Sequence, residues 1–276
     1  MDVLKEFEAL EANLRQSFRI LAETRPRADI AELDGVSIAS LGASFQMFNA
    51  AFLNRHVPTS EDMEDRLNRA RRLFLARGLP WAFWICEDWL ARPVRRALVG
   101  ACERFALRPA AEMPGMVADS LRDPARFSLR GRAAPGLEMR RAEAPRVMQD
   151  FRSIGSVCFH VPPAWFNEVF DDSMPSRDFT CWVGYRGDTP VTTAATVVSD
   201  GVIGLYNVAT APDARGKGYA EAATRHAIAS ASRESGLTRV ILQSTAQGER
   251  LYKRLGFREV SRVVVFNSLP GPAYDQ

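Results

Sequence analysis

Apolar residues recur every three or four positions in several stretches of the chain, which is the spacing of helices with one buried face. This pattern predicts a helix over residues 3–21. It predicts another that begins at about Thr59 and ends at Gly78, and a third that begins near Pro93. In the second half, helices are predicted over residues 145–158, 162–170, 218–235 and 246–255.

Short apolar or alternating runs between these helices predict strands. They cover residues 36–38, 45–53, 81–86 and 111–117 in the first half, and 137–140, 179–186, 190–198, 202–209, 240–243 and 257–266 in the second. Each half has the order strand, helix closed by glycine, strand, helix, strand. Residues 122–136, with Asp123-Pro124 and Pro135-Gly136, have the composition of a linker. We therefore predict an α/β protein with two similar domains, 1–130 and 137–276, each a mixed sheet flanked by helices.

Composition restricts the class of function. Of the 276 residues 46% are hydrophobic and 25% are charged, and 36 basic residues are interspersed with 33 acidic ones, so no basic face for nucleic acid is expected. The four cysteines and three histidines have no metal-ligand spacing. The first residues do not resemble a signal peptide, and the apolar stretch 189–211 is broken by Ser199-Asp200-Gly201. We expect a cytoplasmic protein with no metal and no membrane or nucleic-acid partner.

The loop over residues 207–221 is the strongest candidate for a binding site. Gly216 and Gly218 stand at the entrance to a predicted helix, where backbone N–H groups lack intrahelical partners and face outward. The helix dipole and the side chains of Arg215 and Lys217 add positive charge. The loop is therefore expected to bind a phosphate or pyrophosphate.

Two other phosphate-binding motifs fit less well. A dinucleotide fold requires a third glycine where Glu221 stands and an acid where Gln243 stands, and a P-loop requires Gly-Lys-Ser/Thr. The corresponding loop of the first half, residues 54–60, has no glycine. It is followed by four acids: Glu61, Asp62, Glu64 and Asp65. Since those acids repel phosphate, only the second half is expected to bind this ligand.

Residues 208–220 resemble the acyl-CoA signature of the GNAT superfamily of N-acetyltransferases. The core Arg/Gln-x-x-Gly-x-Gly/Ala of that signature corresponds to Arg215-Gly-Lys-Gly-Tyr-Ala220. Residues 248–257, Gly248-Glu-Arg-Leu-Tyr-Lys-Arg-Leu-Gly-Phe257, resemble the family's C-terminal Leu-Tyr-x-x-Leu-Gly-Phe segment. The resemblance covers residues 137–268. The first half is similar to the N-terminal halves of tandem GNAT proteins in element order only, as a degenerate repeat is.

The resemblance implies direct transfer of an acetyl group from acetyl-CoA to an amine, through a tetrahedral intermediate. It implies that the strand ending at Thr210 pairs with pantetheine and that the helix start binds the pyrophosphate. The implied cofactor residues are Val208, Ala209, Thr210, Arg215, Gly216, Lys217, Gly218, Tyr219, Ala220 and Glu221, with Ser244 and Gly248 as further candidates.

Tyr252 corresponds to the tyrosine that protonates the departing CoA thiolate in many members. Its helix is expected to open at Ser244-Thr-Ala-Gln247, which has capping-box spacing. The family's general-base glutamate corresponds to Gly204, so the base is unassigned. A relayed water or one of the nearby carboxylates remains a candidate: Glu168, Asp171, Asp172 or Asp178.

The acceptor is left open. A peptide N-terminus, an amino acid, a polyamine, an aminoglycoside or a thiol-bearing amine all fit. Trp165, Phe166, Phe170 and Trp182 are candidates to line its pocket, with the N-terminal half as one wall. A non-catalytic acyl-CoA-binding sensor is the main alternative function, and a nicotinamide-dinucleotide enzyme is a third. Oligomeric state is not predicted.

Overall fold

The computed structural model of the chain describes residues 3–121, 134, 136–171 and 178–268. It divides into two compact units. Unit 1 contains Met1–Ser17 and Gly115–Val260, and unit 2 contains Phe18–Pro114 and Ser261–Gln276. In the described part, the strand order is β1-β2-β3-β4-β11-β5-β10-β9-β8-β7-β6. Strands β5 and β11 and helix α1 each contribute residues to both units.

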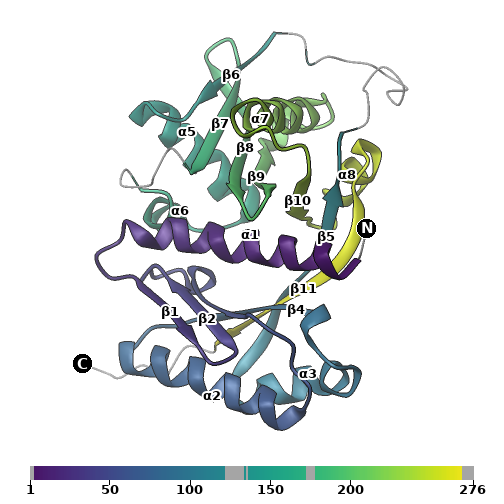
Figure 1. Cartoon of the computed structure of the whole chain (residues 1–276). Coiled ribbons are helices and arrows are strands. Elements are labelled where there is room, and N and C mark those ends of the chain that lie inside the picture. The colour runs from purple at the N-terminus through teal and green to yellow at the C-terminus, as the bar shows by residue number, and fades with distance from the viewer. Residues whose placement is uncertain (1–2, 122–133, 135, 172–177, 269–276) are drawn as a thin grey trace, which may run out of the picture. The chain divides into compact units, whose positions relative to one another are not determined.

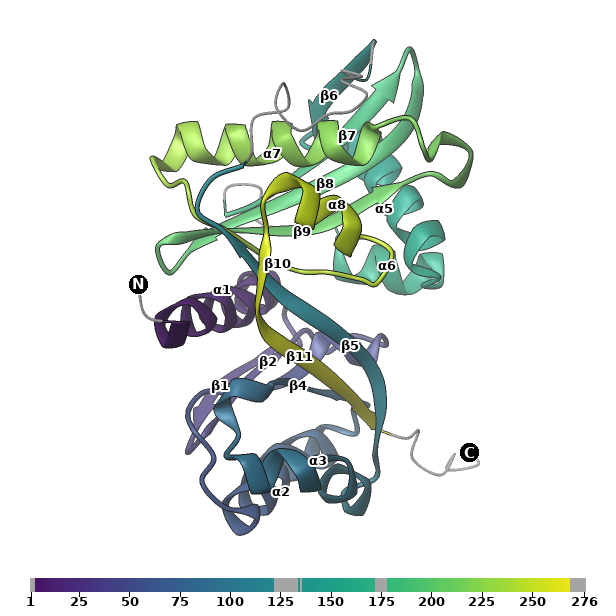
Figure 2. The ribbon, with the colours of Figure 1, turned by 90° about the vertical axis from the view of Figure 1, so that its right-hand side faces the viewer.

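Unit 1 has helices on both faces of its strands. Figure 2 shows α7 on one face and α5 on the other. Ala223 and Ala227 of α7 share a buried cluster with Ile203 of the sheet and Leu255 of α8. The elements that contribute are α1(Val3–Glu23), β5(Leu107–Ala118), β6(Leu137–Arg141), α5(Pro145–Phe159), α6(Pro163–Val169), β7(Phe179–Arg186), β8(Thr189–Ser199), β9(Val202–Thr210), η3(Pro212–Ala214), α7(Tyr219–Ser235), β10(Val240–Gln243), α8(Glu249–Leu255) and β11(Arg258–Ser268).

In unit 2, α2 and α3 cover one face of the strands (Figure 1). Their buried side chains, such as Leu67 and Leu98, pack with Phe83 and Ile85 of β4. On the other face, Phe18 of α1 lies 5.1 Å, ring centroid to ring centroid, from both Phe52 and Trp84. Besides parts of α1, β5 and β11, this unit contains β1(Asp29–Leu33), β2(Val36–Ser40), η1(Gln46–Phe48), β3(Asn49–Leu53), α2(Ser60–Arg77), β4(Ala82–Cys86), η2(Glu87–Trp89) and α3(Arg92–Arg104).

Most predicted elements lie where the hydrophobic pattern places them. Strand β1 was not predicted, since its residues are only half-buried or exposed. The predicted strand 45–53 begins at Asn49 instead, after the short helix η1. The predicted linker 122–136 falls almost wholly outside the described residues.

The predicted start of the last helix at residue 246 is wrong. Helix α8 begins at Glu249, and Gly248 occupies its N-cap position without a side-chain cap. The hydroxyl of Ser244 donates to the carbonyl oxygen of Thr245 at 2.8 Å and caps nothing. Instead Thr245 Oγ1 accepts from the Gly248 N–H at 3.2 Å. The capping-box spacing at 244–247 therefore marks a turn before the helix.

The last strand predicted for each half pairs with a strand of the other half. Met116 and Val117 of β5 pair with β10, antiparallel. Val264 and Val265 of β11 pair with β4, also antiparallel. The two compact units thus have different bounds from the predicted domains 1–130 and 137–276. Those domains describe a repeat in sequence order and stay a prediction.

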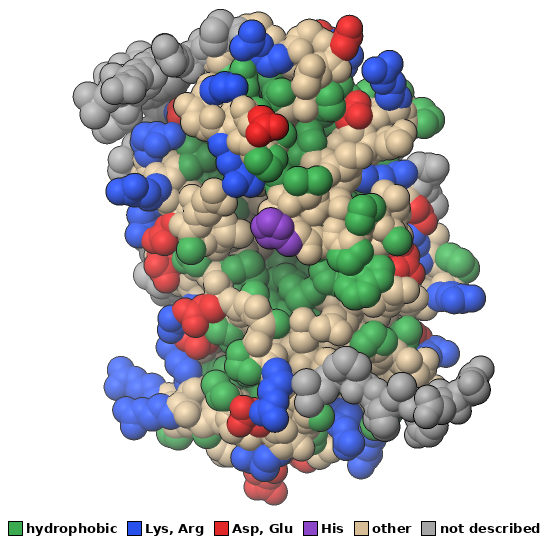
Figure 3. Space-filling view, turned by 180° about the vertical axis from the view of Figure 1, so that it is seen from behind, with side chains coloured by type: hydrophobic (Ala, Val, Ile, Leu, Met, Phe, Trp, Pro, Cys, Tyr) green, Lys and Arg blue, Asp and Glu red, His purple; other side chains and the backbone are tan. Residues whose placement is uncertain are grey.

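Charged side chains of both signs are mixed over the face of the molecule drawn in Figure 3. Among the described helices, none combines the length and the apolar character that a bilayer-spanning helix requires.

Candidate active site

Strands β9 and β10 separate at the centre of unit 1. Their parallel pairing is recorded at Ile203 with Val240 and at Gly204 with Ile241, whereas β9 continues to Thr210. On the other edge of β9 the pairing with β8 shifts register between Thr193 and Ala195. Asn207, opposite this bulge, has a φ of 49°, a left-handed conformation that Asn tolerates better than most residues. The strand edge that faces β10 is thus open to an extended ligand beyond Gly204.

The predicted phosphate loop follows directly from this strand. Gly216 and Gly218 both have left-handed backbones, with φ of 75° and 84°. A side chain at Gly216 would meet no atom within 4 Å, so this backbone is open to approach. Gly218 is the N-cap of α7, and the first intrahelical bond runs from the Ala222 N–H to the Gly218 carbonyl at 3.1 Å. The N–H groups of residues 216–221 have no recorded acceptor among the described residues, so the cradle fits a pyrophosphate.

The two cationic side chains of the loop also hold its shape. Arg215 Nε donates to the carbonyl oxygen of Thr210 at 3.2 Å. Lys217 Nζ donates to that of Asp213 at 3.0 Å. Both side chains are exposed, so their positive charges remain available to a bound phosphate.

Tyr219 and Glu221 contribute to the cradle through their backbone, because their side chains are engaged elsewhere. The Tyr219 ring is buried, and its hydroxyl accepts from Arg186 Nη1 at 3.0 Å. The Glu221 carboxylate accepts from Arg225 at 3.0 Å and from Arg254 at 3.1 Å, which ties α7 to α8. Arg186 was missed from sequence, since nothing local to β7 indicates that it reaches α7.

The three predicted residues after β10 come together. A Cβ at Gly248 would lie 3.0 Å from Tyr252 Cε2 and 3.2 Å from Ser244 Oγ, so the three residues are close-packed and a side chain at Gly248 would have to displace its neighbours slightly. Ser244 is 1% exposed and Tyr252 is 8% exposed. The Tyr252 ring meets Phe257 edge-on, with ring centroids 5.6 Å apart. Its hydroxyl has no hydrogen-bond partner among the described residues and is not fully covered. Burial raises the pKa of Tyr252 above its usual value, so the phenol stays protonated at neutral pH.

Gly204, which corresponds to the family's general-base glutamate, has no space beside it for a side chain. A Cβ at Gly204 would lie 2.0 Å from Asn13 Oδ1 and 2.9 Å from the Tyr206 hydroxyl. Asn13 is fully buried; it accepts from the Tyr206 hydroxyl at 2.7 Å and donates to Ser199 Oγ at 2.8 Å. No carboxylate side chain fits at Gly204 without displacing this network. Asp172 lies outside the described residues, and the base stays unassigned.

The four aromatic residues predicted to line an acceptor pocket do not share one face. Phe166, Phe170 and Phe179 form a buried chain of ring contacts, tilted between the first two and edge-on between the last two, on the α5 side of the sheet. Trp182 belongs to the buried cluster under α7, and its ring lies 4.5 Å from that of His226. Trp165 is partly exposed on α6. Alternation along β7 places Trp182 on the face that α7 covers, so this prediction of a shared lining is wrong.

The corresponding loop of unit 2 is closed by side chains of its own unit. Thr59 caps α2 by accepting from the Asp62 N–H at 3.2 Å. The Arg66 side chain is 1% exposed and donates to the carbonyl oxygens of Arg55 and His56, each at 2.7 Å. It also pairs with the Asp62 carboxylate at 2.7 Å. The loop before α2 thus binds the buried cation of Arg66 through its carbonyl oxygens, and Thr59 caps the helix start, whereas α7 begins without a side-chain cap.

The chain is similar in sequence and in fold to known proteins. Residues 177–259, which contain the cradle and Tyr252, match the model of the acetyltransferase (GNAT) domain. A GCN5-related N-acetyltransferase from Kribbella flavida has a TM-score of 0.70 at 16% identity, over 96% of this chain and 97% of that one. A functionally unknown conserved protein from Staphylococcus epidermidis has a TM-score of 0.63 at 12% identity, over 87% and 94%.

A tandem GNAT protein from the clavulanic acid biosynthesis pathway has a TM-score of 0.53 at 9% identity, over 99% of this chain and 98% of that one. No curated protein matches the chain. The chain thus has a fold similar to that of GNAT N-acetyltransferases, and similar to that of a protein described as a tandem GNAT protein. Within this fold, residues 177–259 are the part that matches the acetyltransferase (GNAT) domain.

Proposed function

We propose that the chain transfers an acetyl group from acetyl-CoA directly to a primary amine of a small-molecule or peptide acceptor. The observation that carries this proposal is the cradle of free N–H groups at the start of α7, directly after the open edge of β9. An acyl-CoA has the matching parts: a pyrophosphate for the cradle, and amide groups in an extended arm for the strand. The match to the acetyltransferase domain supports the same reaction class.

Each part of the site then has a role in the transfer. Residues 208–210 bind the extended arm and residues 216–221 bind the pyrophosphate. The neutral acceptor amine attacks the thioester carbonyl and forms a tetrahedral intermediate. As the C–S bond breaks, the leaving sulfur takes the phenolic proton of Tyr252, which burial keeps on the phenol at neutral pH. The nitrogen loses one proton when the amide forms, and that proton returns through solvent to the Tyr252 oxygen, which regenerates the phenol. Ser244 and Gly248 allow the approach of Tyr252 to this region.

The first experiment is a calorimetric titration of acetyl-CoA into the purified chain. We expect one site per chain, because the glycine loop before α7 leaves the helix start open, whereas the start of α2 is capped by Thr59 and followed by acidic side chains. Two sites would contradict this difference between the loops. The absence of binding would refute the proposal.

A second measurement identifies the chemistry. Thiol release from acetyl-CoA is followed over a panel of amines: a peptide N-terminus, amino acids, polyamines, aminoglycosides and a thiol-bearing amine. Release above the rate of hydrolysis with at least one amine is the expected result. Tight binding of acetyl-CoA with no release for any amine would instead favour a non-catalytic acyl-CoA-binding protein.

A further inference from the structure

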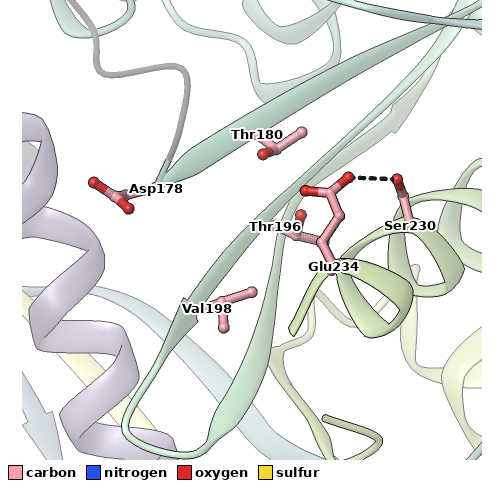
Figure 4. A pocket seen from close by; sticks show the side chains of 7 residues that line it. Asp178, Thr180, Thr196, Val198, Ser230 and Glu234 are labelled. Atoms are coloured by element: carbon pink, nitrogen blue, oxygen red, sulfur yellow. Dashed lines mark hydrogen bonds between the residues drawn. The ribbon is translucent and has the colours of Figure 1, made fainter. Parts of the chain in front are cut away.

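A polar hollow lies on the α7 side of unit 1, near the C-terminal end of that helix (Figure 4). Thr180 and Thr196 are paired residues on neighbouring strands, and they form its floor. The hollow has a cavity volume of about 30 Å³ and opens to solvent. Its lining consists of Asp178, Thr180, Thr196, Val198, Ser230, Ala231 and Glu234.

Thr196 provides an unused hydrogen-bonding group in this hollow. The residue is 3% exposed, yet its hydroxyl has no hydrogen-bond partner among the described residues. The hydroxyl oxygen is not fully covered, so water or a ligand in the hollow can satisfy it.

The other polar groups of the hollow are only partly engaged. Ser230 Oγ donates to Glu234 Oε1 at 3.0 Å, the contact drawn in Figure 4. Arg141 Nη2 donates to Thr180 Oγ1 at 3.2 Å, and Arg141 Nη1 lies 3.9 Å from Glu234 Oε1. The Asp178 carboxylate is exposed and has no recorded partner among the described residues.

The charges favour a cation. Asp178 and Glu234 contribute two negative charges, and the nearby Arg141 contributes one positive charge. The described residues contain no group of three or more His, Cys, Asp or Glu side chains that could hold a metal ion. The lining instead combines carboxylate and hydroxyl oxygens with Val198, whose side chain is 40% exposed. Oxygen acceptors beside an apolar wall suit an ammonium group on an alkyl chain.

We propose that this hollow binds the primary ammonium group of an alkylamine. Glu234 and Asp178 supply the charge, the Thr196 hydroxyl accepts one N–H, and Val198 contacts the alkyl chain. The site is distinct from the acetyl-CoA cradle: Ser230 stands about 16 Å along α7 from Tyr219 at 1.5 Å per residue. The inference does not depend on the proposed transferase activity.

The test is a titration of n-butylammonium into the full chain at pH 7 and low salt, followed by NMR shift changes. We expect saturable binding with shifts at residues of the hollow. Glu234→Gln should weaken it about tenfold or more, as one lost charged hydrogen bond predicts. Thr196→Val, which keeps the shape, should weaken it by a smaller factor. Glu259→Gln, an exposed charge on β11, is the matched control and should leave the affinity unchanged.

Three results would overturn the inference. One is the absence of saturable shifts at the hollow. Another is an equal loss of affinity in Glu234→Gln and Glu259→Gln, which would indicate general attraction to a negative surface. A third is equal binding of uncharged 1-butanol or of sodium ion. Acetyl-CoA titrations of the same variants give an unchanged affinity if the two sites are separate, and a thermal melt of each variant shows that it is folded.

Discussion

At the scale of single residues, the glycines of the candidate active site contribute through their backbone, whereas Tyr252 contributes through its side chain. Gly216 and Gly218 contribute exposed N–H groups, and a left-handed backbone lets them do so. Tyr252 contributes a phenol whose hydroxyl has no partner among the described residues. Binding and chemistry are therefore expected to respond to different substitutions.

Tyr252→Phe should slow thiol release by about 100-fold or more, the usual contribution of a general acid, while acetyl-CoA affinity changes little. The substitution keeps the ring and its edge contact with Phe257.

Because burial raises the pKa of Tyr252, the acid form persists through mildly alkaline pH. The wild-type rate should thus rise with pH as the amine loses its proton, without a decline up to about pH 9. A descending limb near pH 8, or a variant with the wild-type rate, would show that another group gives the proton.

Gly218→Glu should abolish binding of acetyl-CoA, since it places a negative side chain at the cradle. The matched control is Gly218→Ala, which carries the same strain at a φ of 84° without the charge. We expect the control to lose about 1 kcal/mol of stability and to retain measurable binding. Calorimetry and a thermal melt of both variants separate the two effects. Equal affinities in the two would show that the phosphates lie elsewhere.

At the scale of elements, helices α2 and α7 begin at corresponding places of the two units, but their first turns are capped differently. Thr59 caps the first turn of α2 and Arg66 binds the carbonyl oxygens of the loop before it, whereas α7 begins at Gly218 with no side-chain cap. The helix start at this point of the repeated element order is thus closed by side chains in unit 2 and suited to anion binding in unit 1.

Arg66→Ala should lower the free energy of unfolding by about 3 kcal/mol, because it leaves the carbonyl oxygens of Arg55 and His56 without their donor. The matched control is Arg77→Ala on the same helix, where the guanidinium is 59% exposed and pairs with Asp29, so only a small loss is expected. Urea denaturation compares them. Similar losses in the two variants would mean that Arg66 contributes no more than a surface ion pair.

At the scale of the whole molecule, the two halves of the sequence exchange strands. The end of β5 pairs with β10, and the end of β11 pairs with β4. A half of the chain cut out by sequence order therefore lacks a strand that its own sheet requires, and leaves unpaired edges exposed.

Residues 1–121 expressed alone should accordingly fail to unfold cooperatively, because β4 lacks the partner that Val263–Asn267 provides. Co-expression with residues 134–276 should restore a one-to-one complex with a cooperative melt. Circular dichroism and size-exclusion chromatography provide the measurement. A cooperative melt of the short fragment alone would show that its core is sufficient without the exchanged strand.

The local pattern of hydrophobic and polar residues was sufficient to predict most of the helices and strands. Helix ends marked by glycine lie at Gly78, Gly236 and Gly256, each with a left-handed backbone. The loop of residues 207–221 could be recognised because its glycines, charges and helix start are contiguous in the chain. Strand β1 and the start of α8 could not be predicted. The residues of β1, Asp-Ile-Ala-Glu-Leu, do not alternate apolar and polar although their burial alternates, and a capping-box spacing also suits a turn.

The sequence by itself determined the α/β class, the repeated element order and the location of the glycine loop that is proposed to bind phosphate. Each depends on residues within a few turns of one another, where the periods of helix and strand act directly. Only the tertiary structure decided that Asn13 fills the space at Gly204, that Trp182 and Phe166 lie on different faces, and that β5 and β11 cross between the units. These contacts join residues far apart in the chain, and strand pairing depends on which edges meet when the chain folds, which no local period records.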